Sequence, residues 1–195
     1  MAGVQVSAFA APVAAGTFED AVDAHARGDY AKTLRLIRPL ANDGDASAQF
    51  NLGLMYMTGQ GVQQDSAAAA LWFRKAADQG DAVAEFQLGD QYANGKGVPQ
   101  DCSEAMIWFG RAAEQDHSVA KLYLGGMYAE GRGVPQDYVR AHMWFSLAAA
   151  QGVQRAVKTL NMAERKMTPA QIAEARSSHA TGSRLRSHLL VSGAY

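Results

Sequence analysis

Apolar and polar residues follow one another along the chain with the spacing of amphipathic helices. In the stretch AQFNLGLMYMTGQGVQQD, the residues Ala48, Leu52 and Tyr56 lie four positions apart and form one apolar stripe of a helix. A second apolar face follows, in which the large rings of Trp72 and Phe73 stand among alanines at helical spacing. The pattern therefore predicts two consecutive helices, each with one buried face.

This helix pair returns at a constant interval of 36 residues. The stretch AEFQLGDQYANGKGVPQD begins at Ala84, and AKLYLGGMYAEGRGVPQD begins at Ala120. Gly53 and its two counterparts lie beside the apolar stripe, where the missing Cβ lets a neighbouring helix approach closely. One helix pair cannot bury its own apolar face, whereas stacked pairs bury a continuous core. The sequence therefore predicts an all-α fold, an α-solenoid of antiparallel helix hairpins with 36-residue repeats.

Glycine and aspartate mark the ends of the predicted helices. Gly59 and Gly61 end the first helix, because glycine adopts positive φ angles readily. Asp65 precedes an alanine-rich run and is predicted to cap the second helix, a contribution of about 1 kcal/mol. In the second copy, Asp101 and Glu104 have the spacing of a capping box.

The segments on either side of the three copies are predicted to be end units of the array. Upstream, Leu36 and Ile37 stand 36 residues before Trp72 and Phe73. Downstream, Thr168 and Pro169 have the positions of an N-cap and a first helical residue. We predict one solenoid domain over residues 17–176. The chain is divided into an apolar leader (1–16), a degenerate N-terminal hairpin (17–45), three repeats (46–81, 82–117 and 118–153), C-terminal capping helices (154–176) and a flexible tail (177–195).

Composition excludes several classes of partner. The chain has 18 basic and 19 acidic residues, a balance that gives no reason to expect a nucleic-acid or membrane-surface partner. No apolar run reaches the roughly 20 residues that a membrane-spanning helix needs. Cys102 is the single cysteine, so no intrachain disulfide can form. The five histidines show no metal-ligand spacing, and we expect no metal and no cofactor.

The repeated columns resemble the Sel1-like repeat, a 36-residue relative of the tetratricopeptide repeat, in its bacterial form. This resemblance covers residues 46 to about 152 directly. It implies a right-handed solenoid and a non-catalytic scaffold or adaptor that binds another protein and regulates a signalling or envelope process. Bacterial members often begin with a secretion signal and an opening like that of Phe18 to Tyr30, which favours a periplasmic or secreted location.

The N-terminal residues MAGVQVSAFAAPVAAG leave that location open. They are small, apolar and uncharged, and they end in steps that resemble a signal cleavage site, but a basic n-region is missing. Two interpretations remain: a secretion signal whose start is truncated, or a disordered leader.

By analogy with tetratricopeptide arrays, first helices line the concave face, and the columns that vary between copies there are the candidate binding site. Phe50, Phe86 and Leu122 would form an apolar ladder along a groove for a peptide or a helix of a partner. The alternative is that these residues pack between neighbouring helices, and self-association through this face or the tail is a further alternative. The candidate partner-binding residues are Phe50, Leu54, Met57, Phe86, Asp90, Asn94, Leu122 and Glu130, with Ser47, Thr58, Val83, Ala93, Val119, Gly126 and Ala129 in the same columns.

A catalytic alternative comes from the family resemblance. Some cysteine-rich relatives are linked to β-lactam binding and hydrolysis, and Ser118 to Lys121 match the S-x-x-K motif of serine β-lactamases. The companion motifs S-D-N and K-T-G are absent, and so are the paired cysteines of those relatives. We therefore expect that the chain is not an enzyme and has no catalytic residues.

Overall fold

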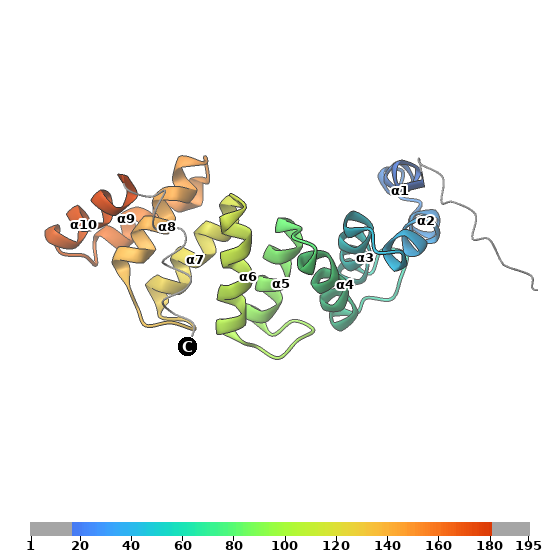
Figure 1. The fold of residues 1–195 in the computed structure, drawn as a ribbon, viewed down its shortest axis with the longest axis horizontal. Coiled ribbons are helices and arrows are strands. Elements are labelled where there is room, and N and C mark those ends of the chain that lie inside the picture. The colour runs from blue at the N-terminus through green and yellow to red at the C-terminus, as the bar shows by residue number, and fades with distance from the viewer. Residues whose placement is uncertain (1–16, 181–195) are drawn as a thin grey trace, which may run out of the picture.

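The computed structural model describes residues 17–180, and this part of the chain is entirely helical. Its first eight helices form four consecutive antiparallel hairpins, and the last two, α9 and α10, both pack on α8. The helices are arranged in an elongated row, with α1 and α10 at opposite ends (Figure 1). The helices are α1 (Thr17–Ala26), α2 (Tyr30–Asn42), α3 (Ala46–Thr58), α4 (Ser66–Asp78), α5 (Ala82–Asn94), α6 (Cys102–Glu114), α7 (Ser118–Glu130), α8 (Tyr138–Ala150), α9 (Gln154–Glu164) and α10 (Pro169–Ala180). The predicted leader lies outside the described residues, as does the tail beyond residue 180.

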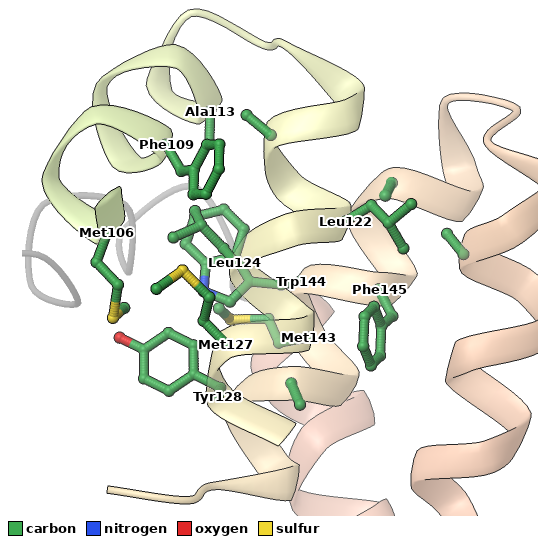
Figure 2. Close-up of a cluster of buried hydrophobic side chains, with 14 of the residues drawn as sticks. Met106, Phe109, Ala113, Leu122, Leu124, Met127, Tyr128, Met143, Trp144 and Phe145 are labelled. Atoms are coloured by element: carbon green, nitrogen blue, oxygen red, sulfur yellow. The ribbon is translucent and has the colours of Figure 1, made fainter. Parts of the chain in front are cut away.

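Helices α1 to α9 each pack mainly on the helices next to them in the chain, whereas α10 packs on α8. The apolar core is accordingly divided into three clusters along the row, each shared by neighbouring hairpins. In the largest cluster, Met106 of α6, Met127 of α7 and Met143 of α8 lie around Leu124 and Trp144 (Figure 2). Within residues 17–180, the main contacts join helices that are adjacent or next but one in the chain, so the fold is the predicted solenoid rather than a globular bundle.

Glycines on the first helices set the distance between the two helices of each hairpin. A Cβ added at Gly53 or at Gly89 would lie 2.7 Å from a ring carbon of Phe73 or Phe109, and one at Gly125 would lie 2.5 Å from Phe145. These phenylalanines are almost fully buried. The predicted close approach is therefore confirmed, and the partner that requires it is the phenylalanine of the same hairpin.

The loops within the hairpins hold successive repeats in register. Gly59 takes a left-handed conformation with φ 75° and ends α3, as predicted. Gly61, with φ 72°, lies so close to the preceding hairpin that an added Cβ would be 2.7 Å from the backbone oxygen of Tyr30. In the next repeats, Gly97 meets the backbone of Ser66 and Gly133 meets that of Cys102. Each loop thus rests on the start of the second helix of the repeat before it.

The predicted aspartate caps form, but the predicted capping box does not. The Asp65 carboxylate accepts hydrogen bonds from the backbone N–H groups of residues 67 and 68, and Asp101 caps α6 in the same way. The Glu104 carboxylate instead accepts a 3.2 Å hydrogen bond from Trp108 Nε1, so it does not return to the cap residue. A reciprocal box is present at α10, where Thr168 N–H donates to Gln171 Oε1 over 2.9 Å and Gln171 N–H donates to Thr168 Oγ1 over 3.3 Å.

The C-terminal cap is held by a polar network that connects three helices. The side chain of Glu164, at the end of α9, lies 3.0 Å from Nε2 of the buried His142 on α8 and 3.1 Å from the Arg176 guanidinium on α10. These two hydrogen bonds lower the pKa of the Glu164 carboxyl below its usual 4.5. The helix α10 continues to Ala180, so residues 177–180, which the sequence placed in the tail, are helical.

Candidate protein-binding groove

A cavity of about 360 Å³ opens on the side of the solenoid that is formed by the first helices. Side chains of α5, α7 and α9 form its walls, and the rings of Phe109 and Phe145, from the second helices α6 and α8, contribute to its floor. Leu122 and Phe145 lie together on one side of the core cluster, away from Met106 and Tyr128 (Figure 2). The cavity is therefore apolar at its base and open to solvent at its rim, as binding sites for side chains of a partner commonly are.

Small residues in the varying columns explain why the cavity lies between α5, α7 and α9. Gly126 stands where the first repeat has Leu54, and no atom outside its own helix lies within 4 Å of an added Cβ. Ala129 likewise stands where the first repeat has Met57. In the first repeat, Leu54 and Met57 place larger side chains in these columns, and both pack onto a core cluster. We call the surface of α5, α7 and α9 around this cavity the α7 groove.

The structure separates the predicted binding residues into different environments. Leu122, Asn94 and Glu130 line the α7 groove together with Gly126 and the alanines of the same columns. Leu54 lies instead at a smaller cavity of about 190 Å³ between α1, α2 and α3, which Thr58 also lines. The predicted residues are therefore divided between the α7 groove, the smaller cavity at α3 and the packed surface between them.

Phe50 and Phe86 pack against rings of their own hairpins. The ring of Phe50 lies 5.7 Å from that of Phe73, and the ring of Phe86 lies 5.6 Å from that of Phe109. The ring of Phe86 also stacks on His117 at 4.8 Å, which connects α5 to the start of α7. Both phenylalanines are half-buried, so their outer edges remain accessible while their packing contributes to the core.

Asp90 and Asn94 pair with each other on the surface of α5. Asn94 Nδ2 donates a 2.8 Å hydrogen bond to Asp90 Oδ1, and Lys96 Nζ lies 3.5 Å from the same carboxylate. These contacts hold the Asp90 side chain over its own helix, at the column where Gly126 leaves the α7 groove open. The predicted acidic point at Asp90 is therefore partly neutralised by Lys96.

Several residues of the α7 groove were missed in the sequence. Arg155, Met162 and Lys166 form the α9 wall, and each lies one interval of 36 residues beyond a column that was identified as inward-facing. Their columns are those of Val119, Gly126 and Glu130. The signal was present, but it was not followed into the segment that was interpreted as a cap.

The rim of the α7 groove carries more positive than negative charge. Arg132 donates a 2.9 Å hydrogen bond to the backbone oxygen of Ala93 and lies 3.8 Å from the Glu130 carboxylate, so these two charges largely offset each other. Arg155 and Lys166 are exposed, and neither forms an ion pair within residues 17–180. The α9 wall is therefore the positively charged side of the groove.

Ser118 and Lys121, the residues of the catalytic alternative, are not hydrogen-bonded to each other in the described structure. Lys121 is buried at the start of α7, and its Nζ lies 2.7 Å from the Asp116 carboxylate. No hydrogen bond connects Ser118 Oγ to this amine in the described structure. Among residues 17–180, moreover, no group of three or more histidine, cysteine or acidic side chains is placed to hold a metal ion. None of the helices seen there has the length and apolar character to cross a membrane.

Comparison with protein families matches the three predicted copies. The family model of the Sel1 repeat covers residues 46–81, 82–117 and 118–153, which is more than half of the chain. The chain belongs to the Sel1 repeat family. Sel1 repeats generally serve as protein-interaction scaffolds, which agrees with the predicted class of function. The comparison with curated protein sequences gives no match.

Two solved structures of bacterial origin have the same fold. A Sel1 repeat protein from Oxalobacter formigenes is 30% identical, with a TM-score of 0.70, and the match covers 74% of this chain and 60% of that protein. The protective antigen c5321 of uropathogenic Escherichia coli, which displays an SLR fold, is 35% identical, with a TM-score of 0.74 over 85% of this chain and 38% of the antigen. These likenesses confirm the predicted right-handed solenoid. The chain spans less than two thirds of the length of either protein.

Proposed function

We propose that this chain is a non-catalytic adaptor that binds a segment of a partner protein in the α7 groove. The observation that supports the proposal best is the apolar cavity between α5, α7 and α9, where Gly126 and Ala129 stand in the columns that Leu54 and Met57 occupy in the first repeat. Of the eight predicted residues, Leu122, Asn94 and Glu130 are proposed to contact the partner first. Phe50, Leu54, Met57, Phe86 and Asp90 are proposed to extend the contact towards α3.

The partner is proposed to act in a signalling or envelope process outside the cytoplasm. This part of the proposal rests on the family resemblance and on the apolar N-terminal residues. A location test is simple: antibody detection of the native protein in periplasmic and cytoplasmic fractions should find it in the periplasm or the medium. Detection only in the cytoplasm would contradict this location and leave the groove proposal unaffected.

A photo-cross-linking experiment tests the binding site directly. A photoreactive side chain is placed at Glu130, on the rim of the groove, and in a matched protein at Glu114, which is exposed at the end of the second helix α6. Irradiation in native extract should give one discrete cross-linked protein from position 130 and not from position 114. The same product from both positions, or from position 114 alone, would contradict a partner site in the groove.

The catalytic alternative makes an opposite prediction. A scaffold should neither hydrolyse nitrocefin nor become labelled by a fluorescent penicillin. Turnover that disappears in a Ser118→Ala variant would contradict the non-catalytic proposal. Ser118 is half-buried at the start of α7, so circular dichroism should confirm that the variant is folded.

A further inference from the structure

The two walls of the α7 groove differ in charge, and this difference favours some partners over others. On the α9 wall, Arg155 and Lys166 stand near the two ends of the helix, with the exposed apolar side chain of Met162 between them. On the opposite wall, the Glu130 carboxylate lies near the Arg132 guanidinium, and Asn94 is hydrogen-bonded to Asp90. The unbalanced charge of the groove is therefore positive and lies along α9.

We infer that the α7 groove selects an acidic, extended peptide segment in which one apolar side chain is flanked on both sides by carboxylates. The apolar side chain would enter the cavity above Phe109 and Phe145, and the carboxylates would pair with Arg155 and Lys166. Charge-assisted hydrogen bonds from arginine and lysine to carboxylates are stronger than neutral ones, particularly beside an apolar cavity. This inference rests on the proposed function and adds the chemistry of the partner to it.

The length of α9 sets the spacing of the two carboxylates. The helix has 11 residues and is therefore about 16 Å long. An extended peptide rises about 3.3 Å per residue, so carboxylates that reach both cations stand about five residues apart. The apolar residue would lie between them, opposite Gly126 and Met162.

The chain's own terminal segments do not supply such a ligand. Residues 1–16 contain no charged side chain, and residues 177–195 contain arginines but no aspartate or glutamate. A positively charged segment would be repelled by Arg155 and Lys166. Charge complementarity therefore favours a segment of another protein over these parts of the same chain.

Selection from a phage-displayed library of random dodecapeptides tests the inference. The full chain is immobilised, and enriched peptides are made synthetically and measured by fluorescence anisotropy. Enriched peptides should carry an apolar residue between two acidic residues about five positions apart. Their binding should weaken about tenfold or more in an Arg155→Gln/Lys166→Gln variant, and it should weaken as salt is raised.

A matched variant controls for the loss of positive charge. Lys158 and Arg165 also belong to the α9 region and are exposed, but they do not line the cavity. The Lys158→Gln/Arg165→Gln variant has the same net charge as the groove variant and should bind the peptides within about twofold of wild type. Circular dichroism should show unchanged helix content in both variants, because all four side chains are exposed.

The outcomes separate this inference from the proposed function. A Gly126→Leu variant should place a large side chain in the cavity and weaken binding about tenfold or more. If peptide binding is weakened by Gly126→Leu but unchanged by Arg155→Gln/Lys166→Gln, the acidic preference is overturned and the groove remains the binding site. Peptides that are insensitive to all variants, or the absence of any enriched sequence, would overturn both. Binding only to a second copy of the chain, seen as concentration-dependent sedimentation, would also overturn the inference.

Discussion

Two adjacent glycines of α7 should respond in opposite ways to the same substitution. A Cβ at Gly125 would lie 2.5 Å from two ring carbons of Phe145 and 3.1 Å from a third, whereas one at Gly126 would meet nothing within 4 Å. Phe145 is only 3% exposed, and although its ring borders the α7 groove, a shift into the groove would expose the ring to solvent and break its packing in the core. Helix propensity alone favours alanine over glycine by about 1 kcal/mol at either position.

The expected free energies follow from these contacts. Overpacking a rigid site costs typically 1–3 kcal/mol, and the buried ring places Gly125→Ala at about 3 kcal/mol. Subtracting the gain in helix propensity leaves a net destabilisation of about 2 kcal/mol for Gly125→Ala. Gly126→Ala has no steric cost and should stabilise the protein by about 1 kcal/mol, so the two variants should differ by about 3 kcal/mol.

Urea unfolding followed by circular dichroism measures the difference. Because repeat arrays can unfold locally, hydrogen exchange of the amides of α7 and α8 should accompany the unfolding curves. Gly53→Ala and Gly89→Ala repeat the test in the same column, where the added Cβ would lie 2.7 Å from a phenylalanine ring. A Gly125→Ala protein that is as stable as Gly126→Ala would refute the packing argument for the whole column.

Three further predictions concern ionisable groups. Nδ1 of His117 accepts the capping hydrogen bond from Ala120 N–H over 3.1 Å, and burial lowers the pKa of this histidine. The stabilisation by the cap is therefore present above pH 6.5, and the melting temperature should fall as the pH falls below it. His117→Asp, which introduces the residue of the earlier repeats, should reduce this fall in melting temperature. Burial raises the pKa of Glu85, so wild-type stability should fall as the pH rises above 4.5. Glu85→Gln, which copies Gln49 of the first repeat, should therefore raise the free energy of unfolding at neutral pH. Unchanged or lower stability of Glu85→Gln at neutral pH would contradict this. Because the pKa of Glu164 is lowered, the stabilisation by its hydrogen bonds is present above pH 4.5 and is lost as the pH falls below it. The hydrogen-exchange protection of α10 should therefore decrease below pH 4.5 more than that of α4. Equal decreases in the two helices would contradict the role of the cap network.

The repeat made most of the fold predictable from one sequence. Identical columns such as Gly53 and Phe73 determine how two helices pack, and the constant interval determines how hairpins stack, so the solenoid follows from local rules. The capping box at Asp101 was predicted wrongly because spacing alone does not show that the Glu104 carboxylate has a competing donor in Trp108. Side-chain competition of this kind depends on tertiary structure.

The candidate site was less predictable than the fold. A column of varying residues indicates which face is accessible, but it does not show where neighbouring side chains leave space. Leu122 and Phe86 belong to the same column, yet Leu122 lines the cavity while Phe86 stacks on His117. The cavity depends on what is missing at Gly126 and on the cations of α9, which lie beyond the three regular copies.

The affinity of the cross-linked partner, or of the peptides that the library yields, for Gly126→Leu protein tests the central claim most directly. Titration calorimetry should compare this variant with Gly126→Ala, which adds only one methyl group to the same position. The account predicts that Gly126→Ala binds like wild type and that Gly126→Leu, though folded, loses about tenfold or more in affinity. Equal affinities of the two variants would contradict a binding site in the α7 groove.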